Sequence, residues 1–487
     1  MHTFERVLQW FANNVFNEVA ILIGLIVLAG LLLQRKRFEE ILAGALRATV
    51  GVYAMFIGIA VFVGGLSAFQ TLVSRAFGKT PPASVVSLDT FMADKGATIA
   101  MVLTIAFLMH VFLVRVLRLK FVYLTGHLMF WMSVVVTASL TTAFGSMGAG
   151  RTGVSWTMVL IGAAILAVYW TVQPIYIANK MRRVIGSDDW GYGHTSSSAC
   201  YLGAAVGKYL GDPEKHDTEK LRLPRALSFF KDVNVSTALV ISAIMLIAMA
   251  FVPNATRVEL ARTYSASMNP WVWAIVSALR FAAGIAILLF GVRMFLAEIV
   301  PAFKGISDRV IPGARPALDC PTIFPFAPTA VMVGFLSSTA AFLVMMALFP
   351  ALGWFGGFVL VPPMIMLFFP GGAAGVYGNK YGGWRGAVAG GVINGLFLAF
   401  GQAIMWHLLA RTGPQMATLA DPDWYIVSWA ILFVKHPFSF ADGYAAFVTV
   451  FGWLLVVAAV YGLYRLTTQL RPKGRELRPP TEIRPAA

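Results

Sequence analysis

Long apolar runs recur along the whole chain, and short polar or basic segments separate them. A helix needs about 20 mostly apolar residues to cross the hydrocarbon layer of a membrane. A shorter apolar run at 425–434 predicts a re-entrant or interfacial segment. The pattern indicates an all-α polytopic membrane protein with eleven spans, at residues 18–34, 48–72, 97–114, 122–143, 154–178, 235–252, 271–298, 329–349, 352–369, 386–409 and 444–464.

Composition and charge agree with this pattern. The chain of 487 residues is 58% hydrophobic and only 12% charged, whereas a soluble domain carries roughly 25% charged residues. Soluble and disordered classes are therefore excluded. The net charge of +16 lies in short segments between apolar runs, which does not fit a basic groove for nucleic acid. Lys and Arg follow the first, third, fifth and last spans, so the positive-inside rule predicts an outside N-terminus and a cytoplasmic C-terminus.

The chain contains a weak copy of itself. Residues 58–77 align without gaps with residues 284–303, and seven of the twenty positions are identical, Gly58 and Gly284 among them. Ala-Leu-Arg recurs upstream of this stretch, and Leu-Asp recurs downstream. Chance similarity between apolar sequences is the alternative explanation. Five spans in the first copy would invert the second copy in the membrane, and inverted repeats are typical of carriers.

The repeat also organises the chain into parts. We expect one integral membrane transporter domain over residues 1–487, with repeat one at about 17–180 and repeat two at about 234–464. A cytoplasmic linker at about 181–233 would join the repeats, and a cytoplasmic tail would occupy residues 465–487.

Each copy is followed by a polar stretch, at residues 84–96 and 311–330. Five prolines forbid a continuous helix in the second stretch. Non-helical backbone survives at membrane depth only where protein buries it or a wet cavity adjoins it. We therefore expect two re-entrant hairpins whose tips meet near the midplane, although the second stretch could be an ordinary loop. Asp89 and Asp319 would be related carboxylates that accept hydrogen bonds from ligand hydroxyls, bind protons, or cap helices.

Two histidines are further candidates. His127 lies within the fourth span after a glycine, and His194 lies in a Gly-broken polar run that can fold back into a cavity. The glycine-rich segment 371–386 predicts a tight turn that lets helices pack closely. No nucleophile–base set, metal quartet or nucleotide fingerprint is present, so we expect no cofactor and no metal, and the enzyme class stays uncertain. Cys200 and Cys320 form no disulfide framework.

Several motifs occur in a fixed order and carry a resemblance. They are TGHLMF (125–130), STALV (236–240), GVRMFLAEI (291–299), AFKGISDRVIPGA (302–314), ALDC (317–320), FAPTAV (326–331) and GGWR (382–385). Together they resemble the ascorbate-specific IIC permease component of the bacterial phosphoenolpyruvate-dependent phosphotransferase system, from about residue 17 to 464. The resemblance implies a homodimeric elevator-type carrier of the inner membrane with eleven spans, two inverted five-span repeats and two hairpins.

The resemblance also implies a function. Such permeases import L-ascorbate, which a separate cytoplasmic IIB protein phosphorylates. IIB and IIA proteins would act in trans, and the chain itself would carry no phosphorylated catalytic residue. The implied substrate contacts are Thr90, His127, His194 and Asp319, while Asp89 and Cys320 are possible coupling or supporting positions.

The sequence departs from the family pattern around these residues. Trp131 and Met132 stand where the family tends to have glutamines, a Thr-Ser run at 195–198 replaces another glutamine run, and Phe91 replaces a tyrosine. The alternative function is therefore a proton- or sodium-coupled secondary carrier of ascorbate or a related sugar acid or polyol. An integral membrane enzyme acting on a lipid head group is a third hypothesis, but an enzyme needs no inverted duplication.

Overall fold

A computed structural model describes residues 19–76, 88–145, 154–220, 233–264, 267–309 and 311–470, together with Arg6, Trp10 and Met147. The described chain is mostly helical. It divides into two compact units, residues 1–428 and 429–487.

The first unit holds most of the helices and all of the described strands. Its α-helices are α2 (Val19–Leu33), α3 (Phe38–Ala76), α4 (Leu88–Val116), α5 (Gly126–Phe144), α6 (Trp156–Ile185), α7 (Ser197–Leu210), α8 (Pro213–His216), α9 (Val233–Ala250), α10 (Asn254–Tyr264), α11 (Pro270–Arg309), α12 (Pro328–Ala351) and α13 (Met364–Leu408). Its 3-10 helices are η2 (Thr218–Lys220), η4 (Cys320–Phe326), η5 (Trp354–Gly356) and η6 (Pro414–Thr418), and its strands are β1 (Phe121–Tyr123), β2 (Gly191–Tyr192) and β3 (Arg315–Leu318).

The second unit is small. Helix α14 (Pro422–Lys435) begins in the first unit and ends in the second, and α15 (Gly443–Leu470) lies wholly in the second. Within this unit Trp429 packs edge-on against Phe447 and Phe451, with ring centroids 4.8 and 5.0 Å apart.

The expectation of a polytopic helical membrane protein is confirmed. Among the described residues, eight helices are long and apolar enough to cross a membrane, and two shorter apolar helices lie at Ile23–Leu33 and Thr237–Ala250. The span expected at 352–369 is wrong in its first half, because η5 and irregular backbone precede Met364. Pro362 and Pro363 explain the late start, since a residue before proline avoids the helical conformation.

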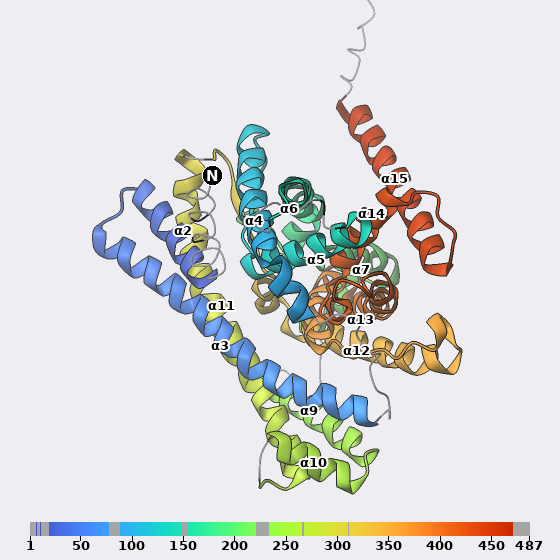
Figure 1. Ribbon diagram of the computed structural model, residues 1–487. Coiled ribbons are helices and arrows are strands. Elements are labelled where there is room, and N and C mark those ends of the chain that lie inside the picture. The colour runs from blue at the N-terminus through green and yellow to red at the C-terminus, as the bar shows by residue number, and fades with distance from the viewer. Residues whose placement is uncertain are drawn as a thin grey trace, which may run out of the picture. The chain divides into compact units, whose positions relative to one another are not determined.

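Helices α3 and α11, which carry the repeated sequence, cross each other closely (Figure 1). A Cβ added at Gly51 would lie 2.7 Å from the Phe295 nitrogen, and one at Gly58 would lie 2.7 Å from the Gly284 oxygen. Residues further along α3 therefore contact residues nearer the N-terminus of α11. The two copies of the repeated helix are antiparallel, and their aligned glycines Gly58 and Gly284 meet at the crossing.

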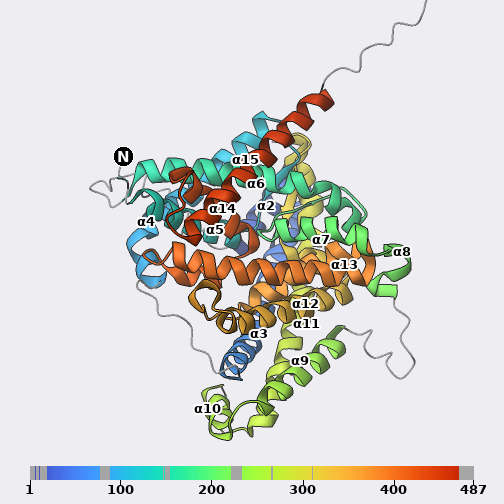
Figure 2. The ribbon, with the colours of Figure 1, turned by 90° about the vertical axis from the view of Figure 1, so that its right-hand side faces the viewer.

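Helix α13 is a hairpin of two antiparallel arms. Its backbone reverses at Gly383, whose φ of 62° and ψ of −153° are not helical. Gly378 and Gly386 face each other across the arms, because a Cβ on Gly378 would lie 2.0 Å from the Gly386 oxygen. The tight turn expected in 371–386 is confirmed, although helix continues on both sides of it. Helices α7 and α12 pack against this hairpin (Figure 2).

The three strands form one parallel sheet in the order β1-β3-β2. Val122 pairs with Pro316 on one side of β3, and Tyr192 pairs with Leu318 on the other. Beyond the strands, Leu124 N–H donates to Ala317 C=O (3.1 Å). Segments far apart in sequence are thus joined by backbone hydrogen bonds.

The two expected hairpins do not form as expected in the described residues. Residues 84–87 lie outside the described part, and residues 88–96 are the first turns of α4. The stretch 311–330 contains no α-helix before Pro328, as its prolines require, but it consists of β3 and η4. The reason is that β1 and β2 offer backbone partners on both sides of β3, so the segment extends instead of turning back.

Candidate functional site

The parallel sheet gathers the candidate polar residues at one edge. His127 follows β1, His194 follows β2 and Asp319 follows β3. Because the carboxyl ends of parallel strands meet at the same edge, the three side chains converge there. Thr125 reinforces this arrangement, since its hydroxyl donates a hydrogen bond to the Gly193 carbonyl.

Asp319 lies between the two histidines. Its Oδ2 is 3.6 Å from His127 Nε2, and its Oδ1 is 3.6 Å from His194 Nε2. The same carboxylate caps η4, because Oδ1 accepts a hydrogen bond from Cys320 N–H (2.7 Å). Its side chain is 12% exposed. Asp319 therefore performs a structural and a potential recognition role at once.

The neighbours of His194 assign its tautomer. Ser196 N–H donates to His194 Nδ1 (3.1 Å), so the ring proton belongs on Nε2, which faces Asp319. Burial lowers the pKa of His194 to about 4, with the Asp319 charge opposing this effect. The imidazole is therefore neutral at pH 7 and offers one donor to the site.

A second carboxyl, Asp421, faces the other ring nitrogen. Its Oδ2 is 3.6 Å from His194 Nδ1 and accepts a hydrogen bond from the Thr195 hydroxyl. Burial raises the pKa of Asp421 to about 8; the hydrogen bond from Thr195 opposes the rise, and the charges of Asp423 and Asp319 add to it. Because Asp421 is protonated at neutral pH, no carboxylate charge faces the lone pair of His194 Nδ1.

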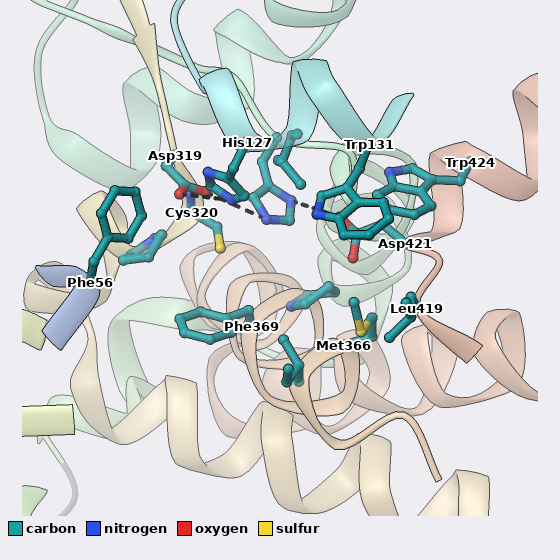
Figure 3. Close-up of a pocket in the computed structure, with 15 residues that line it drawn as sticks. Phe56, His127, Trp131, Asp319, Cys320, Met366, Phe369, Leu419, Asp421 and Trp424 are labelled. Atoms are coloured by element: carbon teal, nitrogen blue, oxygen red, sulfur yellow. Dashed lines mark hydrogen bonds and ion pairs between the residues drawn. The ribbon is translucent and has the colours of Figure 1, made fainter. Parts of the chain in front are cut away.

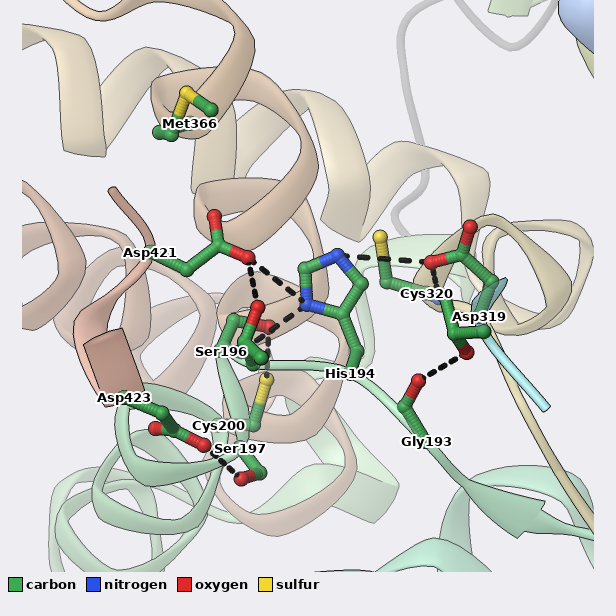
Figure 4. A network of polar contacts seen from close by, with 12 residues as sticks. Gly193, His194, Ser196, Ser197, Cys200, Asp319, Cys320, Met366, Asp421 and Asp423 are labelled. Carbon is green, nitrogen blue, oxygen red and sulfur yellow. Dashed lines mark hydrogen bonds and ion pairs between the residues drawn. The ribbon is translucent and has the colours of Figure 1, made fainter. Parts of the chain in front are cut away.

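Asp423 fixes the loop that carries His194. Its carboxylate accepts hydrogen bonds from Tyr169 Oη (2.6 Å), Ser197 Oγ (2.5 Å) and Ser198 N–H (3.0 Å). Its own N–H donates to the Thr195 carbonyl (2.9 Å). The Thr-Ser run at 195–198 is thus tied to the start of α14 (Figure 4).

We predict that Asp423→Ala destabilises the protein. The three donors would lose a buried carboxylate, and hydrogen bonds to a charged group are worth about 3 kcal/mol at most each, so the free energy of unfolding should fall by about 3 kcal/mol or more. The melting temperature of the detergent-solubilised protein measures the effect. Asp189→Ala, at an exposed carboxylate, is the control; an equal change in both variants would contradict the prediction.

These side chains border a cavity of about 330 Å³. His127 and Asp319 lie on one side, and Met366 and Phe369 of α13 lie on the other (Figure 3). His194 also lines the cavity. Phe56 of α3 stands at one end, against the edge of the His127 ring. At the opposite end Trp131 stacks on Trp424, with ring centroids 6.3 Å apart. The cavity combines a polar wall, an apolar floor and an aromatic end.

Other predicted residues lie in different surroundings. Cys320 is buried and lines the cavity. Thr90 is exposed on the third residue of α4 and is not among the residues that line it. The side chain of Asp89 lies outside the described residues.

Sequence reasoning missed Asp421, Asp423 and Trp424. A signal was present, because two aspartates flank a proline directly before the apolar run at 425–434. In a chain with 12% charged residues, such a pair at the start of an apolar helix is unusual and costly unless it is partnered.

In the described part of the chain, one group of side chains has its possible ligand atoms close enough together to hold a metal ion. The ligand atoms of His194, Asp319 and Cys320 lie within 4.8 Å of one another. The same atoms form the polar wall of the cavity, so a metal there would compete with any ligand that uses this wall.

The chain belongs to the family described as the sugar-specific permease component of the PTS system (EIIC-GAT), whose model matches residues 14–423. A curated relative, the ascorbate-specific PTS system EIIC component of Mycoplasma pneumoniae, is 28% identical over 422 residues. That match covers 78% of this chain and 63% of the relative's length, so the chain spans less than two thirds of that protein. The resemblance drawn from the motifs is confirmed.

Proposed function

We propose that this chain is the IIC permease of a phosphotransferase-type uptake system for L-ascorbate, delivering its substrate to a separate IIB protein. The observation that carries the proposal is the position of Asp319, 3.6 Å from both His127 and His194 on the wall of one cavity. The family and the ascorbate-specific relative support it.

The chemistry of the cavity suits a small hydroxylated monoanion. His127 is the second residue of α5, and His194 lies three residues before α7. The helix dipole makes the N-terminus of α5 favourable for negative charge, whereas at α7 the Asp423 carboxylate already accepts the Ser198 N–H. Asp319 would accept a ligand hydroxyl, and the neutral His194 would donate. Ascorbate presents one delocalised negative charge and several hydroxyls, which matches this set.

The fold supports a carrier built from inverted repeats. The antiparallel crossing of α3 and α11, with Gly58 against Gly284, is the geometry that an inverted duplication requires. Eight spanning helices, of which α13 has two arms, and two shorter apolar helices among the described residues are compatible with eleven crossings. The elevator movement, the homodimer, the cytoplasmic C-terminus and repeats at 17–180 and 234–464 belong to this proposal.

Inside-out and right-side-out vesicles containing the purified permease test the function. Uptake of labelled ascorbate that requires IIB, IIA and phosphoenolpyruvate, with ascorbate phosphate as product, supports it. Uptake that continues without these proteins and collapses with an uncoupler would instead identify a proton-coupled secondary carrier.

A basic and aromatic surface, the α6 patch, offers a docking place for IIB. It consists of Lys180 and Arg183 of α6, Tyr201 of α7 and Tyr381 of α13. Lys180 Nζ lies 4.4 Å from the Tyr201 ring centroid, and Arg183 Cζ lies 4.6 Å from the Tyr381 centroid. Cations held in this way would attract a phosphorylated, acidic partner.

We predict that Lys180→Glu combined with Arg183→Glu slows ascorbate phosphorylation by about tenfold, because two charge reversals repel an acidic partner. Equilibrium binding of ascorbate should not change. Arg115→Glu with Arg118→Glu reverses two exposed cations elsewhere and serves as the control. Equal slowing of phosphorylation in both double variants would show that the α6 patch is not the docking surface for IIB.

A further inference from the structure

Asp421 is a buried carboxyl on the cavity wall for which the motif resemblance assigns no role. It lies between η6 and α14, its exposed fraction is 3%, and it lines the cavity. It comes from a segment separate from the three strand ends that carry His127, His194 and Asp319. Asp421 is therefore a fourth polar side chain in the site, beside His127, His194 and Asp319.

One oxygen of Asp421 is free to meet a ligand. Oδ2 accepts from the Thr195 hydroxyl and faces His194 Nδ1, whereas Oδ1 makes no hydrogen bond in the part of the chain that the structure describes. Figure 4 shows this second oxygen pointing away from the His194 loop, toward the side where Met366 lies. Met366 also lines the cavity. Oδ1 is not among the fully buried, unpaired polar atoms of the described residues, so it is open to the cavity and can pair with a ligand hydroxyl.

We propose that Asp421 is a ligand-binding carboxyl, and that the cavity takes a polyhydroxylated compound with one hydroxyl-bearing end at Asp319 and another at Asp421. This inference rests on the proposed function and adds to it the contact that recognises the second hydroxyl-bearing end of the substrate. For ascorbate, the charged oxygen of the ring would lie at the histidines, a ring hydroxyl would donate to Asp319, and the terminal hydroxyl of the side chain would reach Asp421.

The positions of the two carboxyls support this arrangement. Asp319 and Asp421 face opposite nitrogens of the same imidazole, so the His194 ring separates them. A ligand that contacts both must extend along the ring. Beside Asp421, the stacked pair of Trp131 and Trp424 offers an apolar surface for the C–H groups of such a ligand.

Trp131 brings no hydrogen-bond acceptor to this end of the cavity, because an indole N–H can only donate. Asp421 supplies a polar group at the end of the cavity where Trp131 lies (Figure 3). Because burial raises its pKa to about 8, Asp421 is protonated at neutral pH and does not repel an anionic ligand.

Binding of a matched ligand pair to matched variants tests the inference. L-ascorbate and 6-deoxy-L-ascorbate are titrated at pH 7 into the full-length protein in nanodiscs, as wild type, Asp421→Ala and Asp423→Ala. We expect Asp421→Ala to weaken ascorbate binding about tenfold, the loss of one hydrogen bond, and to change binding of the 6-deoxy compound less than threefold. Asp423→Ala loosens the same loop, but Asp423 is not among the residues that line the cavity. This variant should weaken the binding of both ligands by the same factor.

An equal loss of both ligands in Asp421→Ala would overturn the inference, since it would make Asp421 a positioning residue for the His194 loop. If wild-type protein binds no ascorbate, the proposed substrate fails and the comparison is repeated with galactitol and its 6-deoxy derivative L-fucitol. A selective loss of galactitol binding in Asp421→Ala would then support the role of Asp421. Absence of binding to all four compounds would overturn the assigned substrate class.

Discussion

Replacing Asp319 by asparagine should lower the affinity for L-ascorbate by about thirtyfold, because hydrogen bonds to a charged acceptor are worth about 1.5–3 kcal/mol. The carboxylate lies 3.6 Å from His127 Nε2 and from His194 Nε2. Asparagine has the same shape but no charge, so it would remove the carboxylate that both imidazoles face through Nε2 and offer a weaker acceptor to the ligand. Isothermal titration of the purified protein measures the affinity.

The fold should survive this change. Asp319 caps η4 by accepting from Cys320 N–H, and asparagine is an equally good capping residue. An unchanged melting temperature would separate lost recognition from lost structure. Asp212→Asn, at an exposed cap that accepts from Glu214 N–H and is not among the cavity-lining residues, is the matched control. Wild-type affinity in Asp319→Asn would remove this carboxyl from the site.

Replacing Gly378 by leucine should abolish folded protein. A Cβ at Gly378 would lie 2.0 Å from the Gly386 oxygen and 2.5 Å from the Gly386 carbon. These are backbone atoms of the opposite arm, so relief requires the arms to separate. Overpacking a well-packed core typically costs about 1–3 kcal/mol, and a clash with backbone costs more. Since the first arm provides Met366 and Phe369 to the cavity floor, binding should be lost as well.

The yield of a monodisperse peak in size-exclusion chromatography measures this outcome. Gly96→Leu is the control, because Gly96 also lies inside a helix but has nothing within 4 Å of an added Cβ. We expect near wild-type yield for Gly96→Leu. Normal yield and ascorbate binding in Gly378→Leu would show that the arms of α13 are less tightly packed than the structure places them.

Local patterns in the sequence predicted the helices well. Apolar runs of about 20 residues identify spans because a membrane-crossing helix must be continuous and apolar. Residues 352–363 misled this reasoning, since they are apolar but contain Pro362 and Pro363, which prevent a regular helix start. Glycines in 371–386 correctly indicated close packing. Helix on both sides of Gly383 was not foreseen, because the contact with the opposite arm outweighs the low helical propensity of glycine.

The site was predictable only in part. His127, His194 and Asp319 stand in short distinctive motifs, so each could be named without knowing its neighbours. The sheet that brings them together could not be seen, because strands of two to four residues carry no periodic pattern. Asp421 was missed for a related reason. Its importance comes from contact with Thr195 and His194, more than two hundred positions away in the chain.

The order of the strands bears on how the protein is made. The middle strand, β3, is the last of the three to be synthesised, and β1 and β2 pair only with it. A nascent chain inserted as far as α10 therefore holds two strands with no partner, and the sheet that positions His127 and His194 cannot form before β3 has left the ribosome. Biogenesis should depend on this late step, so that slowing translation between α7 and β3 exposes an unfinished intermediate to quality-control proteases for longer.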